Sequence, residues 1–313
     1  MNIYIDTPFR ERHKQYLRKA IQDDELVFKD ELATPGEQLA ALLSADILLG
    51  NPKPVEWLQK ADNLKWVQLY STGFEYYSHI SIPAVITNMQ DYYSRPCAET
   101  VVAGILALYR GIDTCTRLKD QQKWVGYTLR KEFQILSGKK IIILGWGNIG
   151  KRTAAILKGF NCQINIYSRS SSDAHMHTAE ELKKQLPYAD IVIGCLPGTG
   201  QTRGMFTTEM IRLMKPGAVF CNAGRGNLLQ DEQALITALH QKKLGGAVLD
   251  VTAEEPIPAQ HPLWTCPNTI LSQHSGGGSA TEYDGIAELF IQNLQAFKRG
   301  EPLKNQVQFE KGY

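Results

Sequence analysis

A glycine-rich segment carries the clearest chemical signature in this chain. Residues 145–150 read GWGNIG, directly after an apolar run at 141–144 and before a helical pattern at 151–158. In such a loop the first glycine permits a tight turn, the second lets the backbone approach a pyrophosphate, and the third allows close helix–strand packing. Because a second strand follows at 163–167, we interpret the segment as a dinucleotide-binding loop rather than a plain turn. Its candidate cofactor contacts are Gly145, Gly147, Asn148, Ile149 and Gly150.

The residues after that second strand indicate which dinucleotide binds. An NAD site usually has an acidic side chain here, which bonds the 2′-hydroxyl of the adenosine ribose. This sequence has Ser168, Arg169 and Ser170 instead. A guanidinium and hydroxyl groups suit a phosphate, and no carboxylate stands at this position to repel it. We therefore expect NADPH or NADP as cofactor, with NADH possible at lower preference; the alternative is a solvated arginine and use of either cofactor.

Short apolar runs alternate with helical stretches along the chain, in two series. The first series lies at residues 2–6, 26–28, 46–50, 66–70 and 84–87, with helical stretches such as 38–43 and 55–60 between its runs. The second lies at 140–144, 163–167, 191–195, 218–221, 246–250 and 269–271. Alternation of this kind predicts parallel sheets with helices on both faces. We expect an α/β protein with two doubly wound parallel-sheet domains, the second larger.

Two long helices are expected to join these domains. One begins near Pro96, a residue that suits a first helical turn, and runs to Arg110. The other covers residues 281–298 and presents one apolar stripe. Because it follows the last strand of the second series, we expect the chain after it to pack back on the first domain. The expected domains are residues 1–94 plus 286–313 for substrate and residues 95–285 for the dinucleotide.

The composition excludes several classes of protein. With 43% hydrophobic and 21% charged residues among 313, the chain can bury a core, and a formal net charge of +2 gives no reason to expect nucleic acid or a membrane surface as partner. The longest apolar stretch, residues 101–109, is too short to span a bilayer, and no signal-peptide pattern is present. Six cysteines stand singly, so we expect neither a metal nor disulfides, and a cytoplasmic location.

Further motifs follow the glycine loop in a fixed order. They read NAGRG at 222–226, DVTAEEP at 250–256 and QHSGG at 273–277, and WVQLYSTG at 66–73 precedes them. Together they make the chain resemble the D-isomer-specific 2-hydroxyacid dehydrogenases over nearly its whole length. The NADP-type loop looks most like the glyoxylate/hydroxypyruvate reductase branch. The resemblance implies a flavodoxin-like substrate domain, a Rossmann cofactor domain and a homodimer formed through the cofactor domain.

The resemblance assigns the reacting groups to Arg225, Glu255 and His274. Hydride transfer to a ketone leaves an alkoxide that must take up a proton, and a histidine suits this task near neutral pH. A carboxylate can hold the imidazole in one tautomer and favour its charged form, and an arginine can bind the oxo and carboxylate oxygens of the substrate. Counting forward from Arg225 favours Glu254 as the carboxylate, whereas the Glu-Pro step favours Glu255, which we prefer.

Substrate and cofactor need further contacts. Ser71, Thr72 and Gly73 follow a strand of the first series and could offer consecutive backbone N–H groups to a carboxylate, a role that the resemblance also implies. Further cofactor contacts that the resemblance implies are Leu196, Pro197, Ala223 and Asp250, the last of these to the nicotinamide amide. We also expect the two domains to close on the cofactor and shield hydride transfer from water.

These observations predict an NADPH-dependent oxidoreductase that acts on CH–OH groups. Its expected reaction is reduction of a small 2-oxo acid, of glyoxylate or hydroxypyruvate type, to the D-2-hydroxy acid, with His274 as proton donor. The alternatives are an NAD-dependent D-lactate-type or phosphoglycerate-type dehydrogenase, a formate or phosphite dehydrogenase, and a non-catalytic dinucleotide-sensing protein on the same fold. Tyr92 and Tyr93 could line the substrate cleft or simply pack. Trp264 could face the substrate, but we expect core packing for it.

Overall fold

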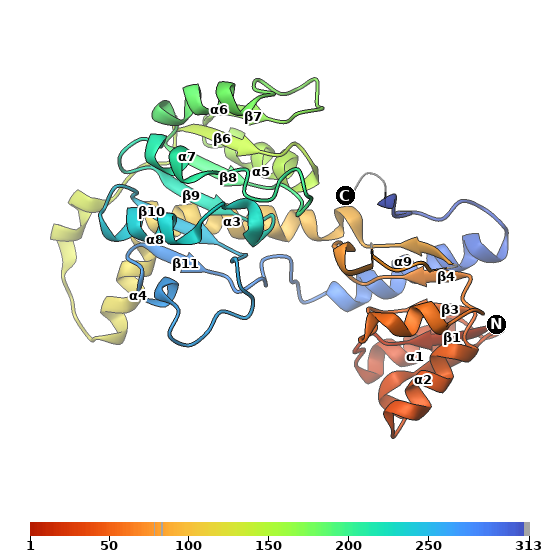
Figure 1. Ribbon diagram of the computed structural model, residues 1–313. Coiled ribbons are helices and arrows are strands. Elements are labelled where there is room, and N and C mark those ends of the chain that lie inside the picture. Colours follow the sequence, from red (N-terminus) through yellow and green to blue (C-terminus); the bar gives the residue numbers. More distant parts are fainter. Residues whose placement is uncertain (78, 83, 310–313) are drawn as a thin grey trace. The chain divides into compact units, whose positions relative to one another are not determined.

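The computed structural model describes residues 1–77, 79–82 and 84–309 and divides into two compact units (Figure 1). Unit 1 comprises Met1–Tyr93 and Ser279–Tyr313, and unit 2 comprises Ser94–Gly278. The chain therefore passes between the units twice. The long helix α3 (Ser94–Tyr109) begins at the first crossing, and α9 (Glu282–Lys298) begins just after the second. Their starts lie within two residues of those predicted from the sequence.

Unit 1 contains a five-stranded sheet in the order β2-β1-β3-β4-β5, in which all paired strands are parallel. This is the flavodoxin-like strand order that the sequence predicts. Each strand overlaps a predicted apolar run. The strands are β1 (Asn2–Ile5), β2 (Glu25–Phe28), β3 (Ile47–Leu49), β4 (Trp66–Gln68) and β5 (Val85–Thr87).

Alternate side chains of β1 enter two separate cores of unit 1. Ile3 and Ile5 pack with α1 (Glu11–Ala20) and α9, whereas Tyr4 packs with α2 (Pro35–Ser44) on the other face. A strand buried on both faces is apolar throughout, which is why its sequence shows a continuous run. The predicted stripe of α9 supplies Ile286, Phe290 and Leu294 to the first of these cores.

Unit 2 contains a six-stranded sheet in the order β11-β10-β9-β8-β6-β7, again parallel throughout. The strands are β6 (Lys140–Leu144), β7 (Gln163–Tyr167), β8 (Ile191–Gly194), β9 (Val219–Asn222), β10 (Gly246–Leu249) and β11 (Thr269–Leu271). The order reverses at β6, which lies between β7 and β8. Ligands of open α/β sheets bind beyond the carboxyl ends of the strands at such a reversal.

Helices cover both faces of the sheet in unit 2. Ile141 and Ile143 of β6 pack in a core with α3 and α5 (Asn148–Lys158). Ile142 and Leu144 pack on the opposite face, in a core to which three further helices contribute, namely α6 (Ala179–Gln185), α7 (Thr208–Leu213) and α8 (Glu232–His240). With both faces covered, the ends of the strands are left for a ligand, and the reversal at β6 favours the carboxyl ends.

Short helices complete the described chain. The stretch predicted as helical at residues 55–60 is a 3-10 helix, η2 (Val55–Lys60), and α4 (Ile112–Asp120) follows α3. Within the described ranges, no helix combines the length and the apolar character that crossing a bilayer requires. The other 3-10 helices are η1 (Lys29–Glu31), η3 (Glu75–Tyr77), η4 (Gln90–Tyr93), η5 (Gly126–Glu132), η6 (Leu186–Tyr188), η7 (Gly226–Leu228) and η8 (Pro262–Thr265).

Candidate active site

The three glycines between β6 and α5 have three different surroundings. Gly145 has a φ of +102°, and a Cβ placed on it would lie 2.8 Å from the carbonyl oxygen of Cys195. A Cβ on Gly150 would lie 2.3 Å from the carbonyl oxygen of Gly145, whereas no described heavy atom lies within 4 Å of a Cβ on Gly147. Packing and backbone conformation thus require the outer two glycines. The middle one faces open space, as a loop that receives a pyrophosphate should.

The segment after β7 leaves the sheet beside this loop, because the Gly145 N–H donates to the carbonyl oxygen of Tyr167 at 2.9 Å. Ser168 is half-buried, and Arg169 and Ser170 are exposed. Arg169 forms no hydrogen bond or ion pair with any described residue. Its guanidinium is therefore available to an anion that approaches the carboxyl edge of the sheet.

The segments after β8 and β9 pack tightly on each other at the same edge. Leu196 and Pro197 follow β8, and a Cβ on Gly224 would lie 2.4 Å from the carbonyl oxygen of Leu196. Asn222 is buried; its side chain donates to the carbonyl oxygen of Arg225 at 2.9 Å and accepts from the Gly224 N–H at 3.1 Å. The Asn222 amide therefore holds the turn that contains Ala223 and ends at Arg225.

His274 and Glu255 form a direct pair. Nδ1 of His274 lies 2.6 Å from Oε2 of Glu255, and Oε1 of Glu255 accepts from the Thr252 N–H at 3.0 Å. The histidine side chain is 52% exposed, and its Nε2 forms no hydrogen bond with the described residues. The structure thus pairs His274 with Glu255 rather than Glu254, and it leaves the second ring nitrogen open to a ligand.

Asp250 holds the turn that presents His274. This buried carboxylate accepts through Oδ1 from the Gly276 N–H at 2.9 Å and from the Ser272 hydroxyl at 2.7 Å. The carbonyl oxygen of Asp250 accepts from the His274 N–H at 2.6 Å. His274 has a φ of +53°, a left-handed conformation that costs energy for a residue with a side chain. The three hydrogen bonds to Asp250 keep the backbone in that conformation.

The turns that carry Arg225 and Glu255 touch each other. A Cβ on Gly226 would lie 1.7 Å from the carbonyl oxygen of Thr252, so only glycine permits this approach. Nη1 of Arg225 donates to the carbonyl oxygen of Gly224 at 2.9 Å. Arg225 and Glu255 are thus positioned by one packed contact at the carboxyl edge of the sheet.

The loop at residues 71–73 belongs to unit 1 and follows β4. The Ser71 hydroxyl donates to the carbonyl oxygen of Gly73 at 2.7 Å, and the Asn88 side chain donates to the carbonyl oxygen of Thr72 at 2.7 Å. Among the described residues, none accepts a hydrogen bond from the backbone N–H groups of 71, 72 or 73. The carbonyl groups of this loop accept hydrogen bonds, whereas its three backbone N–H groups have no acceptor among the described residues.

Comparisons with known proteins identify the family. The model of the D-isomer specific 2-hydroxyacid dehydrogenase NAD binding domain matches residues 102–276. The chain belongs to the D-isomer-specific 2-hydroxyacid dehydrogenases. A glyoxylate reductase of Pyrococcus furiosus is 33% identical over 261 residues, which are 79% of this chain and 76% of that protein. A glyoxylate/hydroxypyruvate reductase A of Arabidopsis thaliana is 34% identical over 230 residues, 71% of this chain and 70% of that protein.

Solved structures agree with this assignment. A D-isomer specific 2-hydroxyacid dehydrogenase family protein from Aeromonas salmonicida superimposes with a TM-score of 0.85 at 29% identity, over 98% of both chains. The predicted fold of two parallel-sheet domains is therefore confirmed. The NAD-binding character that the glycine loop predicts is confirmed as well, because the matched family model is that of an NAD-binding domain.

Three aromatic side chains of this dehydrogenase each donate a hydrogen bond to a backbone carbonyl group. The Tyr92 hydroxyl donates to the carbonyl oxygen of Thr281 at 2.9 Å, and the Tyr93 hydroxyl donates to that of Tyr70 at 2.6 Å. Burial, reinforced by the nearby Glu282 carboxylate, raises the pKa of Tyr93. Both tyrosines pack within unit 1. The expectation of core packing for Trp264 is wrong: the side chain is 45% exposed and fastens its loop through an N–H bond to the Pro258 carbonyl.

One supporting residue of this dehydrogenase is not apparent from its sequence. Oε1 of Glu232 accepts from the Ala253 N–H at 3.0 Å, and Oε2 lies 3.5 Å from Nε2 of His261. Glu232 therefore anchors the turn that carries Glu255. In the sequence it looks like an ordinary acid in the first turn of a helix, a common position for glutamate. Only its contact with a distant loop distinguishes it.

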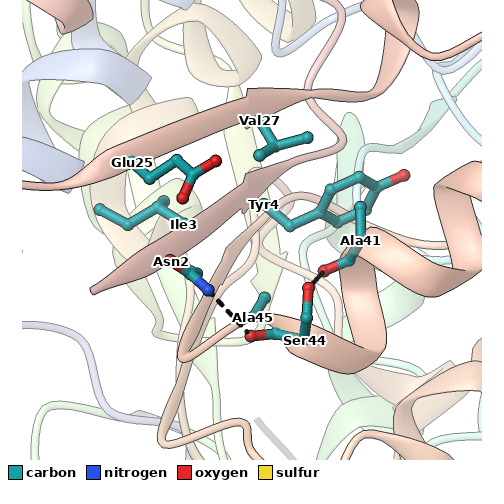
Figure 2. A pocket seen from close by; sticks show the side chains of 8 residues that line it. All are labelled: Asn2, Ile3, Tyr4, Glu25, Val27, Ala41, Ser44 and Ala45. Atoms are coloured by element: carbon teal, nitrogen blue, oxygen red, sulfur yellow. Dashed lines mark hydrogen bonds between the residues drawn. The ribbon is translucent and has the colours of Figure 1, made fainter.

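Two pockets of this dehydrogenase lie away from these residues. One of about 60 Å³ lies where β1 and β2 begin, beside α2, as Figure 2 shows. Another of about 170 Å³ lies where β6 and β7 begin. Ligand pockets usually enclose roughly 300–1,000 Å³. These two are too small for a dinucleotide and lie at the amino ends of the strands, whereas the candidate site lies at the carboxyl ends.

Two thiols, one in α3 and one directly after β8, have pKa values raised by burial. Burial raises the pKa of Cys97 to about 11 and that of Cys195, directly before Leu196, to about 12. Both thiols therefore stay protonated near neutral pH. A protonated thiol is a poor nucleophile, so neither of these two thiols is activated.

Proposed function

We propose that this enzyme uses NADPH to reduce a small 2-oxo acid, of glyoxylate or hydroxypyruvate type, to the D-2-hydroxy acid. The observation that carries the proposal is the His274–Glu255 pair at the same sheet edge as the glycine loop. The glyoxylate and hydroxypyruvate reductases among the relatives support this substrate class. When bound, the nicotinamide supplies the hydride.

His274 is the proposed proton donor. Glu255 binds Nδ1, so Nε2 is the nitrogen that faces the substrate. In the reducing direction a charged imidazole gives its Nε2 proton to the oxygen at C2, and the glutamate stabilises the positive charge before the transfer. In the oxidising direction the neutral imidazole accepts the same proton. Glu255 also fixes the ring orientation, because its second oxygen is held by the Thr252 N–H.

Substrate binding is assigned to two groups of donors. We propose that Arg225 binds the oxo and carboxylate oxygens through its planar guanidinium. The N–H groups of Ser71, Thr72 and Gly73 are proposed to bind the substrate carboxylate. Turnover then depends on residues of both units, and we propose that domain closure accompanies it.

NADPH is the proposed preferred cofactor because of the exposed Arg169 and its serine neighbours. Ser168, Arg169 and Ser170 would receive the 2′-phosphate. Leu196, Pro197 and Ala223 are proposed to line the cofactor, and Asp250 to contact the nicotinamide amide.

Mixing the enzyme with NADPH and a panel of 2-oxo acids tests the proposal. We expect loss of the NADPH absorbance band with glyoxylate and hydroxypyruvate, and chiral chromatography should identify the D-glycerate product from hydroxypyruvate. Preference for pyruvate with NADH would favour a D-lactate-type dehydrogenase. Tight NADPH binding without any turnover would favour a dinucleotide-sensing protein and overturn the proposal.

A homodimer is proposed to form through residues 112–135 of unit 2, which we call the arm. The arm exposes large apolar side chains, among them Trp124, which is 96% exposed, and Tyr127, which is 74% exposed. Clustered exposed apolar side chains of this size are typical of protein interfaces. Ile112, Val125 and Ile135 extend the same exposed set.

Sedimentation equilibrium tests the dimer. We expect the native chain at twice its monomer mass, and Trp124→Glu combined with Tyr127→Glu at the monomer mass, because two charges would be buried unpaired. Tyr188→Glu is the matched control, since Tyr188 is exposed on unit 2 but lies outside the arm. A native monomer, or a dimer that survives the double substitution, would contradict this assignment.

A further inference from the structure

A tryptophan in the glycine loop contacts the one acidic side chain of the neighbouring loop. Nε1 of Trp146 donates to Oδ2 of Asp173 at 2.8 Å. Trp146 stands between the first two glycines, and Asp173 is the only acid in residues 168–178. The bond therefore joins the loop that follows β6 to the loop that follows β7. Neither the family resemblance nor the proposed mechanism gives Trp146 or Asp173 a role.

The base of the loop after β7 is already closed by other bonds. The Ser168 N–H donates to the carbonyl oxygen of Met176 at 3.0 Å, and Nδ1 of His177 lies 2.8 Å from the carbonyl oxygen of Ser168. Met176 is buried, which anchors this end of the loop in the core. Asp173 lies farther out, where its N–H donates to the Ser171 hydroxyl at 3.3 Å. Trp146 is thus the link between the outer part of the loop and the glycine loop.

A free carboxylate in this loop would oppose NADPH. The loop after the second strand is where a dinucleotide fold reads the adenosine ribose, and an acid there accepts a bond from the 2′-hydroxyl of NAD. The same charge repels a 2′-phosphate. Asp173 lies only four residues beyond Arg169. The loop therefore contains one group that favours NAD and one that favours NADP. An indole N–H is purely a donor, and it can hold a carboxylate in one place.

We propose that Trp146 is a specificity-determining residue, which occupies the Asp173 carboxylate with its indole N–H and leaves the 2′ position to Arg169. The inference rests on the proposed NADPH preference. Trp146 acts on the cofactor through Asp173, so it is a positioning residue. Its indole N–H matters here more than its ring.

A double-mutant cycle on cofactor binding tests the proposal. The dissociation constants of NADP and NAD are measured by isothermal titration calorimetry for Trp146→Phe, Asp173→Asn and the combined variant. Trp146→Phe keeps an aromatic ring but frees the carboxylate, and the ratio of NADP to NAD affinity should fall about tenfold, the size of one charge-assisted contact. Asp173→Asn alone should change the ratio little. In the combined variant the ratio should return to the native value.

Two outcomes would overturn the proposal. One is a ratio that stays unchanged in Trp146→Phe; the other is a combined variant that loses as much as Trp146→Phe alone. Trp264→Phe is the matched control, since it removes another indole N–H bond in unit 2, the one to the Pro258 carbonyl at 2.9 Å. If the phenyl ring disturbs the loop and lowers the melting temperature, Trp146→Leu repeats the test.

The same measurements separate this proposal from the proposed cofactor preference. If the native enzyme binds NAD as tightly as NADP, the preference fails. The specificity role of Trp146 then fails with it, because it rests on that preference. If the native preference is present and the cycle shows no coupling, the role of Trp146 fails alone.

Discussion

The two units share a strand order but differ where their first strands end. In each sheet the first strand lies between the second and the third strand of that unit. The strand order of both sheets therefore reverses at the first strand. In unit 2 the residue after β6 is Gly145, which opens the phosphate loop. In unit 1 the residue after β1 is Asp6, whose Oδ1 lies 2.6 Å from Nζ of Lys29. The first strand of unit 2 is followed by open space, whereas the first strand of unit 1 is followed by a partly buried ion pair.

Packing at the end of β1 makes the contrast sharper. A Cβ on Gly50, directly after β3, would lie 2.7 Å from Cβ of Asp6. The glycine of unit 1 thus makes room for a protein side chain, whereas Gly147 of unit 2 leaves room for a ligand. Strand order alone therefore does not make a dinucleotide site. The residues that follow the first strand decide whether the reversal point is open.

Among these substitutions, removal of His274, the proposed proton donor in unit 2, should have the largest effect. We expect His274→Ala to lower the rate of reduction by about a hundredfold or more, the usual contribution of general acid catalysis. Cofactor affinity should be retained, because the histidine does not contact the phosphates. Steady-state rates and calorimetric titration with NADPH measure the two effects. Full activity in this variant would contradict the proposed role of His274 as proton donor.

Glu255, the carboxylate that contacts His274, should affect how the rate of reduction depends on pH. Reduction needs a charged imidazole, so its rate should fall as pH rises, and oxidation should show the reverse trend. Glu255→Gln keeps a hydrogen-bond acceptor but removes the charge, so the fall in the reductive rate should move to lower pH. Glu254→Gln is the matched control and should leave the profile in place. The opposite result would exchange the roles of the two glutamates.

Arg169→Ala tests whether Arg169 makes the site of unit 2 prefer NADPH over NADH. Loss of one charge-assisted contact is worth about 1.5–3 kcal/mol, so the Michaelis constant for NADPH should rise roughly ten- to a hundredfold. The constant for NADH should stay nearly unchanged, because NADH has no 2′-phosphate. Arg203→Ala, a substitution in the loop after β8, serves as control. Equal effects on both cofactors would mean that Arg169 does not read the phosphate.

Two alanine substitutions separate packing from ligand space within the glycine loop. Gly150→Ala places a Cβ against the Gly145 carbonyl and should cost about 1–3 kcal/mol of folding stability, as overpacking typically does. Gly147→Ala should leave the melting temperature unchanged and weaken cofactor binding instead. Thermal melts of the apo enzyme and titration with NADPH distinguish the two effects. A large loss of stability in Gly147→Ala would show that the middle glycine is also needed for packing.

The smallest expected effect concerns the ion pair of unit 1. Burial raises the pKa of Asp6, and the contact with Lys29 offsets this only in part. The folded state therefore holds this proton more tightly than the unfolded state, and stability is lost as pH rises through the titration range of the carboxyl. Asp6→Asn cannot ionise and should be more stable than the native chain at pH 7, by less than about 1 kcal/mol. The difference should disappear at acidic pH.

Asp46→Asn is the control of opposite sign. The hydrogen bond from Lys65 and that from the Asn2 N–H lower the pKa of Asp46, so its charge stabilises the fold above its ordinary titration range. This variant should lose stability at pH 7, and the loss should fade as pH falls through the pKa. Denaturant unfolding at two pH values measures both variants. Equal signs for Asp6 and Asp46 would mean that burial is not what distinguishes the two carboxylates.

Local sequence pattern was sufficient for most of the fold. The predicted bounds of β6, β7 and β11 match those of the structure, because a buried parallel strand is a continuous apolar run with turn residues at its ends. Helix α1 was not predicted, since most of its residues are polar and only its inner face is buried. The prediction for Trp264 was wrong because its indole N–H bonds a nearby carbonyl and the ring stays exposed.

The sequence by itself determined the family, the two-sheet architecture and the dinucleotide loop, because each depends on residues that are close together in the chain. Tertiary structure decided which of two adjacent glutamates meets His274. Glu254 and Glu255 are equivalent by local criteria, and the choice follows from the Thr252 bond and the packing of Gly226 against that turn. It also decided that Trp146 meets Asp173. Such pairs depend on how separate loops leave the sheet, and no local pattern encodes that geometry.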